Sequence, residues 1–204
     1  MAVRDAAATQ RRIVAAALKE FAAKGIAGAR VDAIATRANT NKRMIYYYFR
    51  SKEGLFREIL RQRLARRPGQ PAPEDLPYAE RIAMRTRVSA SAESRDYTRL
   101  LMWEALETRS RNQKVMAEEE RLAIYADLRD RVAKAQDAGE LPVDLDPAQM
   151  VLSELALTLF PSAFPQLVRM VTGTAVDDPA FIAAREAHLV RLIEHLAEQP
   201  IPRA

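Results

Sequence analysis

The sequence contains no cysteine, only six glycines and only two histidines among 204 residues. Without cysteine, neither a disulfide framework nor a thiolate metal site can form. No run of 18 uncharged apolar residues occurs, and the N-terminal MAVRDAAATQRR has no apolar signal core. We therefore expect a cytoplasmic protein with no membrane partner. No segment alternates between apolar and polar residues over a useful length, which favours an all-α fold.

The sequence also lacks what catalysis needs. It has no glycine-rich phosphate loop, no nucleophile elbow and no catalytic cysteine. His188 and His195 lie seven residues apart on one helical face, beside Glu194, but two histidines do not make a zinc triad. Glu104 and Glu107 would need Glu-x-x-His motifs to complete a di-metal site, and none exists. We expect no enzyme, no metal and no cofactor.

Charge is distributed unevenly along the chain. Residues 1–67 hold 16 Lys and Arg against 5 Asp and Glu, a net charge of +11. Residues 68–204 hold 16 basic and 22 acidic side chains, a net charge of −6. Such asymmetry indicates a polyanionic partner for the N-terminal part. An anionic membrane surface would also attract it, but its apolar residues are needed to close a small helical core, so DNA is the better partner.

The basic part is organised around residues 30–55, RVDAIATRANTNKRMIYYYFRSKEGL. Apolar residues at helical spacing predict a first short helix there; they are Val31, Ile34, Ala35 and Ala38. Residues 39–41, Asn-Thr-Asn, favour a turn, and Asn41 is placed to cap a second helix over Lys42–Phe49. The pattern predicts two short helices joined by a tight polar turn, with a third helix capped by Ser51.

The second short helix has two different faces. Ile45 and Phe49 share the apolar face. At about 100° per residue, the opposite face carries two arginines and two tyrosines, namely Arg43, Tyr46, Tyr47 and Arg50. This face fits a DNA major groove, where arginine meets phosphates and guanine edges and tyrosine hydroxyls bond phosphates. The alternative is a helical corner with a solvated basic face.

We assign two roles to the predicted DNA contacts. Lys42, Arg43, Met44 and Tyr47 are expected to read base edges. Tyr46, Tyr48, Lys52 and the N-terminal arginines are expected to bind phosphates, Lys52 from a helix N-terminus. The full set predicted to contact DNA is Arg30, Asn41, Lys42, Arg43, Met44, Tyr46, Tyr47, Tyr48 and Lys52.

This stretch resembles the helix-turn-helix of the tetracycline-repressor (TetR) family of bacterial transcription regulators. The matching segments are Phe21–Gly25, Val31–Ala35, Asn41–Phe49 and Ser51–Phe56. Asn39 stands where the family usually has glycine, and asparagine can take the left-handed conformation that the turn needs. No Ser or Thr at Ala29 or Arg30 caps the first short helix, and we expect the Asp32 carboxylate to serve its N-terminus instead.

The resemblance implies three parts. Residues 1–50 form the helix-turn-helix domain, and residues 51–73 form a connecting helix that ends in a Pro-rich linker. Residues 74–204 form a helical domain that binds a ligand and dimerises. Before the helix-turn-helix, a first helix from about residue 6 to 24 is expected to end at Gly25.

The helix predicted from Pro147 to Phe160, with breaks at Pro161 and Pro165, is apolar almost all round. Such a helix must be buried on every side, and one layer of helices does not cover it together with the stripe of the last helix. We expect a second copy to cover both, as the resemblance also implies, with a monomer core as the alternative. The predicted dimer residues are Met150, Leu157, Phe181, His188, Leu189, Leu192, His195 and Leu196.

The resemblance further implies a small-molecule site inside the C-terminal domain. Its candidate lining is Met84, Tyr97, Leu101, Trp103, Glu104, Glu107, Tyr125, Leu155 and Phe160, where a glutamate could meet a cation. The alternative for each is that it fills the helical core.

These expectations combine into one hypothesis: a homodimeric repressor places two helices on a palindromic double-stranded operator and is released by a small-molecule effector. Two other classes remain open. One is a DNA-binding protein whose C-terminal domain only dimerises. The other is a helical binding protein or enzyme whose basic head is incidental.

Overall fold

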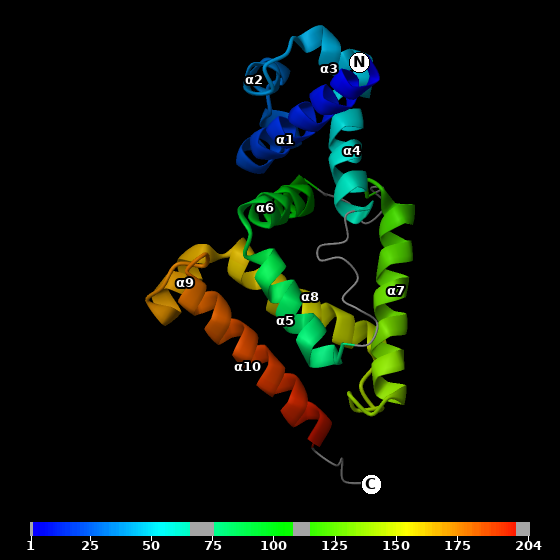
Figure 1. Ribbon diagram of the computed structural model, residues 1–204, viewed down its shortest axis with the longest axis vertical. Helices are drawn as coiled ribbons and strands as arrows, with labels where there is room; N and C mark the ends of the chain where they lie inside the picture. Colours follow the sequence, from blue (N-terminus) through cyan, green and yellow to red (C-terminus); the bar gives the residue numbers. More distant parts are fainter. Residues whose placement is uncertain (1, 66–75, 108–114, 199–204) are drawn as a thin grey trace. The chain divides into compact units, whose positions relative to one another are not determined.

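The computed structural model describes residues 2–65, 76–107 and 115–198, and its regular structure is helical (Figure 1). Within these ranges the chain forms α1 (Ala2–Gly28), α2 (Val31–Arg37), α3 (Lys42–Phe49), α4 (Lys52–Ala65), α5 (Tyr78–Ser89), α6 (Ala92–Glu107), α7 (Glu118–Asp137), α8 (Pro147–Ala163), α9 (Pro165–Thr172) and α10 (Pro179–Glu198). The predicted all-α fold is confirmed. The predicted Pro-rich linker, residues 68–73, lies outside the described residues.

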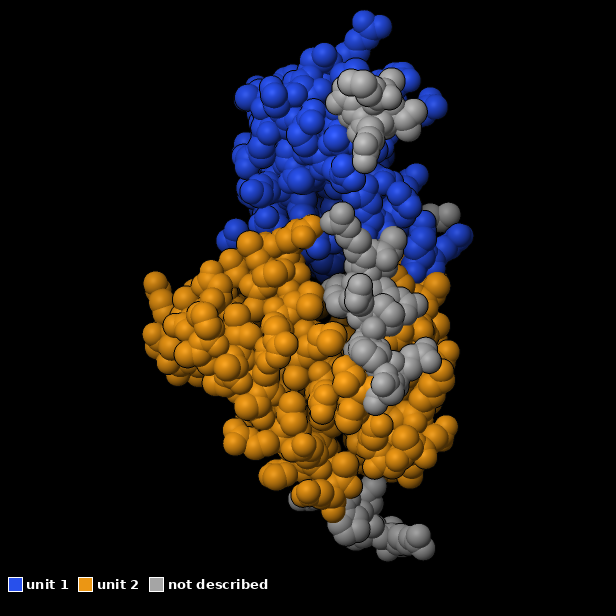
Figure 2. Space-filling view, viewed as in Figure 1, with its two compact units in different colours: residues 1–65, 96–120 blue, residues 66–95, 121–204 orange. Residues whose placement is uncertain are grey.

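Contacts group the chain into two compact units (Figure 2). Unit 1 consists of residues 1–65 and 96–120, and unit 2 consists of residues 66–95 and 121–204. The division expected from the sequence sets all of α6 in the C-terminal domain. By packing, most of α6 belongs with the helix-turn-helix instead.

The core of unit 1 is built on the apolar stripe of α1. Ile13, Ala17 and Phe21 recur every four residues and are completely buried. The Phe21 ring meets the Phe56 ring edge to face, with 5.8 Å between the ring centroids. The same cluster includes Ile34, Ile45 and Leu55, with the partly buried Phe49 packed against it. At about 1.5–3 kcal/mol for each large side chain, this burial fixes α2, α3 and α4 on α1.

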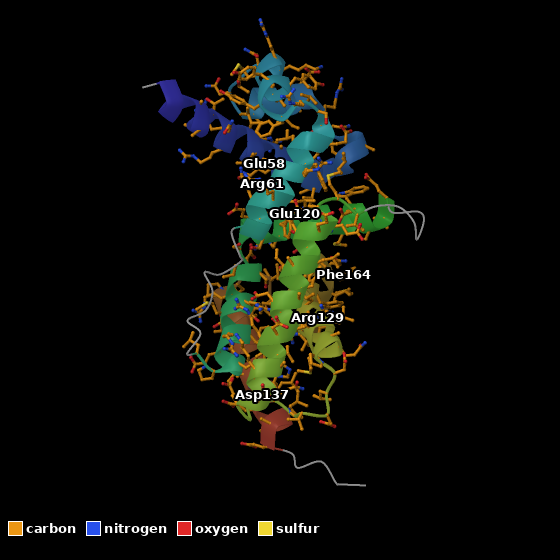
Figure 3. The ribbon with its side chains drawn as sticks, turned by 90° about the vertical axis from the view of Figure 1, so that its right-hand side faces the viewer. Glu58, Arg61, Glu120, Arg129, Asp137 and Phe164 are labelled. Atoms are coloured by element: carbon orange, nitrogen blue, oxygen red, sulfur yellow. The ribbon has the colours of Figure 1, made fainter. Side chains whose placement is uncertain are left out.

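α4 is held by its apolar face more than by its charges. Its buried residues are Leu55, Phe56, Ile59 and Leu60. On its surface the Arg61 guanidinium donates two hydrogen bonds of 2.8 Å to the Glu58 carboxylate (Figure 3), which lowers the pKa of Glu58. Pairs one turn apart stabilise a helix by only about 0.2–0.5 kcal/mol.

α1 bends at Gly25, as expected for a glycine at the end of a helix. Its φ is +68°, and one further helical turn follows to Gly28. A Cβ at Gly25 would lie 3.1 Å from the Trp103 ring, and the Trp103 Nε1 donates to the Ala22 carbonyl at 3.2 Å. Within unit 1, α6 therefore packs against the end of α1 at the one residue type that leaves room.

The core of unit 2 lies among α5, α7, α8 and α10, and α5 packs along α10 (Figure 1). Its buried apolar residues include Ile82, Val132, Val151 and Leu189. Two serines join α5 to α8. Ser89 Oγ donates to the Thr158 carbonyl at 2.9 Å, and Ser162 Oγ donates to the Ser89 carbonyl at 2.8 Å.

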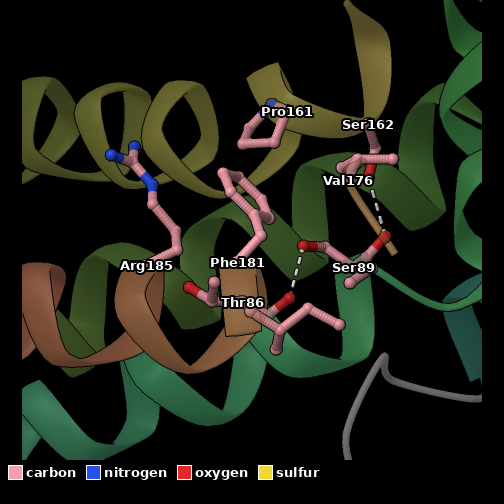
Figure 4. A pocket seen from close by; sticks show the side chains of 9 residues that line it. Thr86, Ser89, Pro161, Ser162, Val176, Phe181 and Arg185 are labelled. Carbon is pink, nitrogen blue, oxygen red and sulfur yellow. Dashed lines mark hydrogen bonds between the residues drawn. The ribbon is translucent and has the colours of Figure 1, made fainter. Parts of the chain in front are cut away.

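α8 continues through Pro161 to Ala163, so the expected break at Pro161 is wrong. Proline has no N–H, which leaves the Leu157 carbonyl without its helical donor. Arg185 on α10 replaces that donor, with its Nη2 at 3.1 Å from the carbonyl oxygen. Burial lowers the pKa of the Arg185 guanidinium. Pro161, Phe181 and Arg185 also border a cavity of about 10 Å³ (Figure 4), room for about one water molecule.

The second expected break, at Pro165, is observed. The chain turns at Phe164, and Pro165 starts α9, a separate helix that the sequence analysis does not predict. α9 ends at Thr172, and the Gly173 that caps it has a φ of +74°. Among the described helices, none has by itself the length and hydropathy to cross a membrane; α8 and α9 meet that test only as a pair bent by 87°.

Candidate nucleic-acid interface

α3 begins and ends where the sequence predicts, at Lys42 and Phe49. Asn41 caps it, because its side-chain Oδ1 accepts a 3.0 Å hydrogen bond from the Met44 N–H. Such a cap satisfies one of the backbone donors that a helix N-terminus leaves free and contributes about 1 kcal/mol. The side-chain oxygen of Asn41 is therefore already used in a hydrogen bond within the protein, at the N-terminus of α3.

The two faces of α3 differ as predicted. Ile45 is 1% exposed, whereas Tyr47 is 75% exposed and Tyr46 is 42% exposed. Arg43 is also exposed, and Met44 and Tyr48 are half-buried. The Tyr48 ring stacks edge to face between Tyr47 and Phe49. The rings of Phe49, Tyr48 and Tyr47 therefore form a continuous row that leads from the core to the surface.

A hydrogen bond from α1 stabilises the turn between α2 and α3. Asn39 has φ +49°, the left-handed conformation expected of it. The Thr40 N–H donates to the Ala35 carbonyl at 3.0 Å, which closes the turn on α2. Arg12 Nε donates to the Ala38 carbonyl at 3.2 Å. Arg12, one of the N-terminal arginines expected to meet phosphates, thus already has a structural role.

The N-terminus of α2 is served by a residue that sequence reasoning misses. Arg30 makes no side-chain cap. Its backbone N–H instead donates to Glu20 Oε1 at 3.4 Å. The Asp32 carboxylate, expected to serve this N-terminus, pairs with the Lys42 ammonium at 3.2 Å on the protein surface. The reciprocal half of a capping box therefore comes from α1, across the fold.

Glu20 is the central carboxylate of unit 1, residues 1–65 and 96–120, which we call the head. Its side chain is 3% exposed and accepts a 2.8 Å hydrogen bond from Lys24 Nζ, with Arg37 Nη2 at 4.0 Å. The hydrogen bond from Lys24, followed by that from the Arg30 N–H, lowers the pKa of Glu20 although burial opposes the shift. The sequence signal was a glutamate inside the α1 stripe with lysine four residues later.

Lys52 is tied to the protein backbone. Its Nζ lies 3.2 Å from the Ala27 carbonyl oxygen and 3.4 Å from that of Ala29. It therefore holds the start of α4 against the connection between α1 and α2. Its predicted contact with phosphate remains a prediction, and a phosphate would have to share the ammonium with these carbonyls.

Some of the cations of residues 6–63 are paired with carboxylates, and the unpaired ones form a positive surface. Lys24 and Arg37 meet Glu20, Lys42 meets Asp32, and Arg61 meets Glu58. Those for which the described residues provide no side-chain partner are Arg11, Lys19, Arg30, Arg43, Arg50 and Arg57, and all six are exposed. Unpaired cations on one small unit create the field that attracts a polyanion.

The predicted ligand residues divide between the units. Tyr97, Leu101, Trp103, Glu104 and Glu107 belong to unit 1, and Met84, Tyr125, Leu155 and Phe160 belong to unit 2. Tyr97 and Leu101 pack against the core of the head, where Trp103 binds the Ala22 carbonyl. Phe160 is 48% exposed and Tyr125 is 42% exposed. None of the nine borders the cavity beside Arg185.

Unit 2 contains a charged pair between a buried glutamate and a half-buried arginine, which the sequence does not predict. Arg85 pairs with Glu154, and the Tyr78 hydroxyl donates to Glu154 Oε2 at 3.0 Å. Burial raises the pKa of Tyr78 and lowers that of Arg85. Around this pair, Arg81 lies near Glu140 at 3.8 Å and over the Tyr78 ring at 5.5 Å. No group of three potential metal ligands occurs in the described part of the chain.

The predicted dimer residues lie on different surfaces. Leu189 is completely buried among its own neighbours, so it has no surface to offer a partner and its assignment is wrong. His188 and His195 are exposed, and Leu196 is 37% exposed. Met150, Leu157, Phe181 and Leu192 are half-buried. The most exposed leucine of α8, Leu152 at 59%, is absent from the prediction.

A capped, outward-facing helix on a braced positive head defines a class of protein, the helix-turn-helix DNA-binding regulators. The sequence comparisons narrow that class. Residues 13–59 match the family model for bacterial regulatory proteins of the tetR family, and residues 81–193 match that for tetracyclin repressor-like C-terminal domains. The chain belongs to the TetR family, and it is a transcriptional regulator and not an enzyme.

Relatives agree with this assignment. The HTH-type transcriptional repressor SCO4008 of Streptomyces coelicolor is 32% identical over 176 residues, which cover 85% of this chain and 88% of the relative. The structure of the transcriptional regulator SCO4942, also from Streptomyces coelicolor, has 34% identity and a TM-score of 0.73, covering 94% and 99% of the two chains. FadR of Bacillus subtilis, solved with stearoyl-CoA, shares the fold at 19% identity and a TM-score of 0.65, over 88% and 97%.

Proposed function

We propose that the protein is a cytoplasmic, homodimeric repressor that binds a palindromic operator through α3 and leaves it when a small molecule binds unit 2. The observation that carries this proposal is the pair of faces on α3. Ile45 is buried in the head while Arg43 and Tyr47 project outward. One eight-residue helix reaches only a few base pairs, so two copies related by a two-fold axis would raise both affinity and specificity.

Within α3 we assign base reading to the exposed side chains of its first turns. Arg43 has no competing partner among the described residues, so its guanidinium is free to meet a guanine edge. Lys42 would first have to leave Asp32. Tyr46 and Tyr48 are assigned to phosphates, together with Lys52 and Arg30. Asn41 and Met44 would position α3 close to the duplex.

A selection experiment tests the DNA-binding part. Duplexes enriched from a random pool should converge on an inverted repeat, and the affinities of single-base variants should then be measured by fluorescence anisotropy. Arg43→Ala should lose about 1–3 kcal/mol of discrimination at one base pair of each half-site. Equal weakening on every variant would reassign Arg43 to the DNA backbone, and no enrichment at all would contradict the proposed function.

The dimer is supported by the outward side of α8. A helix that is apolar almost all round leaves Leu152 59% and Phe160 48% exposed in the single chain. Ala156, midway between them, is exposed on the same side. On α10, the exposed His188 and His195 lie seven residues apart and share a face. We propose that these two faces form a four-helix interface with a second copy.

Light scattering after size exclusion tests the interface. Leu152→Arg should convert a dimer into a monomer, because it places a charge in the middle of the apolar contact. Leu122→Arg is the matched control, since Leu122 is 61% exposed on α7 and should leave the dimer intact. A monomeric wild type, or a dimer that tolerates Leu152→Arg, would exclude this interface.

We place the effector site in unit 2, near Arg85 and Glu154. Buried polar groups within an apolar bundle are what fixes a ligand's orientation, and the adjacent Met84 and Leu155 are half-buried. FadR of Bacillus subtilis is a precedent for a ligand in this fold. A thermal-shift screen against metabolites and drugs should find a compound that raises the melting temperature and releases DNA in the same concentration range. A screen in which no compound raises the melting temperature would favour a regulator whose C-terminal domain only dimerises.

A further inference from the structure

α3, the helix that we propose to read the DNA, ends in an unusual turn centred on Arg50. Its backbone has φ +65° and ψ −44°, and the Ser51 N–H donates to the Phe49 carbonyl at 2.7 Å. A hydrogen bond between residues two apart around a positive φ defines a γ-turn of the rare, strained kind. Glycine adopts this conformation without the steric cost that a side chain brings. The chain nevertheless places arginine there.

The surrounding residues hold this turn in place. A Cβ at Gly54 would overlap the Phe49 carbonyl oxygen, so only glycine lets that oxygen lie against the first turn of α4. Ser51 Oγ accepts a 3.0 Å hydrogen bond from the Gly54 N–H. The Arg50 N–H still donates to the Tyr46 carbonyl at 2.9 Å, which keeps the turn attached to α3. A strained residue persists only where its neighbours determine its conformation in this way.

The Arg50 side chain is exposed, and the described residues provide no partner for its guanidinium. Its Cα follows the last helical residue of α3 and lies on the side of Arg43 and Tyr47, opposite the buried Ile45. It therefore contributes nothing visible to the folded chain that would offset the strain of its backbone.

We propose that Arg50 binds a phosphate of the DNA backbone and that the γ-turn fixes the direction of its guanidinium. Strained residues cluster where a ligand is held, because the strain pre-organises the contact. A phosphodiester suits a fixed, planar fork of donors and carries no sequence information. The contact would place the end of α3 against the DNA backbone while its first turns face the bases. This inference rests on the DNA-binding function.

The test uses a fluorescein-labelled duplex of random sequence, with affinity measured at several salt concentrations. Arg50→Ala and Arg50→Gly should both weaken binding about tenfold at low salt, and the slope of log affinity against log salt should fall by about one. Arg50→Lys should keep most of the slope because it keeps the charge. Arg99→Ala, which removes an exposed arginine from α6 of the same unit, should change neither quantity.

Stability separates the contact from the strain. Arg50→Gly should increase the ratio of folded to unfolded protein by roughly fivefold in urea titrations, whereas Arg50→Ala should not, since alanine keeps the unfavourable φ. A glycine variant that binds the duplex with wild-type affinity and slope would overturn the proposal. So would a loss of affinity at an unchanged slope. Failure of the wild type to bind any duplex would instead sink the DNA-binding function itself.

Discussion

The two units treat polar side chains in opposite ways. Of the polar side chains buried among the described residues, only Glu20 and Thr98 lie in unit 1, and the other seven lie in unit 2. Apart from Glu20, the head keeps its charges outside an apolar core, which suits a rigid body that presents one helix to a charged polymer. Unit 2 buries the carboxylate of a charged pair and a set of hydroxyls, which are costly to leave without a hydrogen-bond partner.

Because of this difference, unit 1 is stabilised mainly by apolar burial, whereas unit 2 also depends on buried polar interactions. Apolar burial contributes stability in proportion to the area buried, whereas a buried ion pair adds little net stability and costs much when one partner is removed. The effector that we propose for unit 2 would act by competing for one of these buried polar groups and so shifting the equilibrium between two arrangements. The following substitutions test the comparison, beginning with the largest expected effect.

Glu154→Ala should destabilise the protein by about 3–5 kcal/mol, because it removes a buried carboxylate and leaves the half-buried Arg85 and the Tyr78 hydroxyl without their acceptor. The free energy of unfolding from urea titration measures this loss. Glu186→Ala is the control, since Glu186 pairs with the exposed Arg87 at 2.5 Å on the surface of the same unit. Equal losses in the two variants would remove the distinction between the interior of unit 2 and its surface.

Glu20→Gln should cost about 1–3 kcal/mol at neutral pH, since the carboxylate bonds both the Lys24 ammonium and the Arg30 N–H. The wild type should lose this advantage in acid. Because the folded-state pKa of Glu20 is lowered, its contribution is complete above its ordinary pKa of about 4.3 and disappears as pH falls through the lowered value.

The free energies of unfolding of the wild type and Glu20→Gln should therefore converge as pH decreases from about 5 to below 3. Circular dichroism during urea titration at each pH measures both proteins. A difference that persists undiminished at the lowest pH would mean that Glu20 acts through its shape and not through its charge.

Local signals in the sequence predicted much of the head. Asn41 and the apolar pair on α3 define that helix from neighbours within eight residues, and the structure reproduces its bounds. Gly25 and Asn39 mark positions of positive φ, and both have it. In each case the determining interactions lie within a turn or two of chain, so pattern and propensity are sufficient.

What the sequence could not predict depends on partners far along the chain. Pro161 stays inside α8 because Arg185 supplies the missing donor from another helix. The N-terminus of α2 is served by Glu20, ten residues before the Arg30 N–H. Leu189 has the spacing of an interface residue, yet the packing of α10 on α5 buries it completely. Such tertiary contacts override the local rules that predicted otherwise.

Asn41→Ala should cost about 1 kcal/mol of stability through loss of the cap on α3. The cap fixes the first turn of the recognition helix, so affinity for the selected operator should decrease more than affinity for random duplex. Asp146→Ala removes the matching cap of α8, whose Oδ1 accepts from the Gln149 N–H at 2.9 Å, and serves as the control in unit 2. It should reduce stability by a similar amount while leaving operator discrimination unchanged.

The smallest effect on stability is expected at the surface of the head. The Asp32 and Lys42 side chains are 68% and 50% exposed, so Asp32→Asn should change the free energy of unfolding by about 0.5 kcal/mol or less. Its effect on DNA should be larger and of opposite sign. Removing the carboxylate frees Lys42 and deletes a negative charge beside α3, so random duplex should bind several-fold more tightly at low salt, with the gain lost as salt screens the charges. The double variant Asp32→Asn with Lys42→Met should cancel this gain, because the liberated ammonium is then absent. Tighter binding that survives both high salt and the second substitution would show that Asp32 opposes DNA by some means other than its charge.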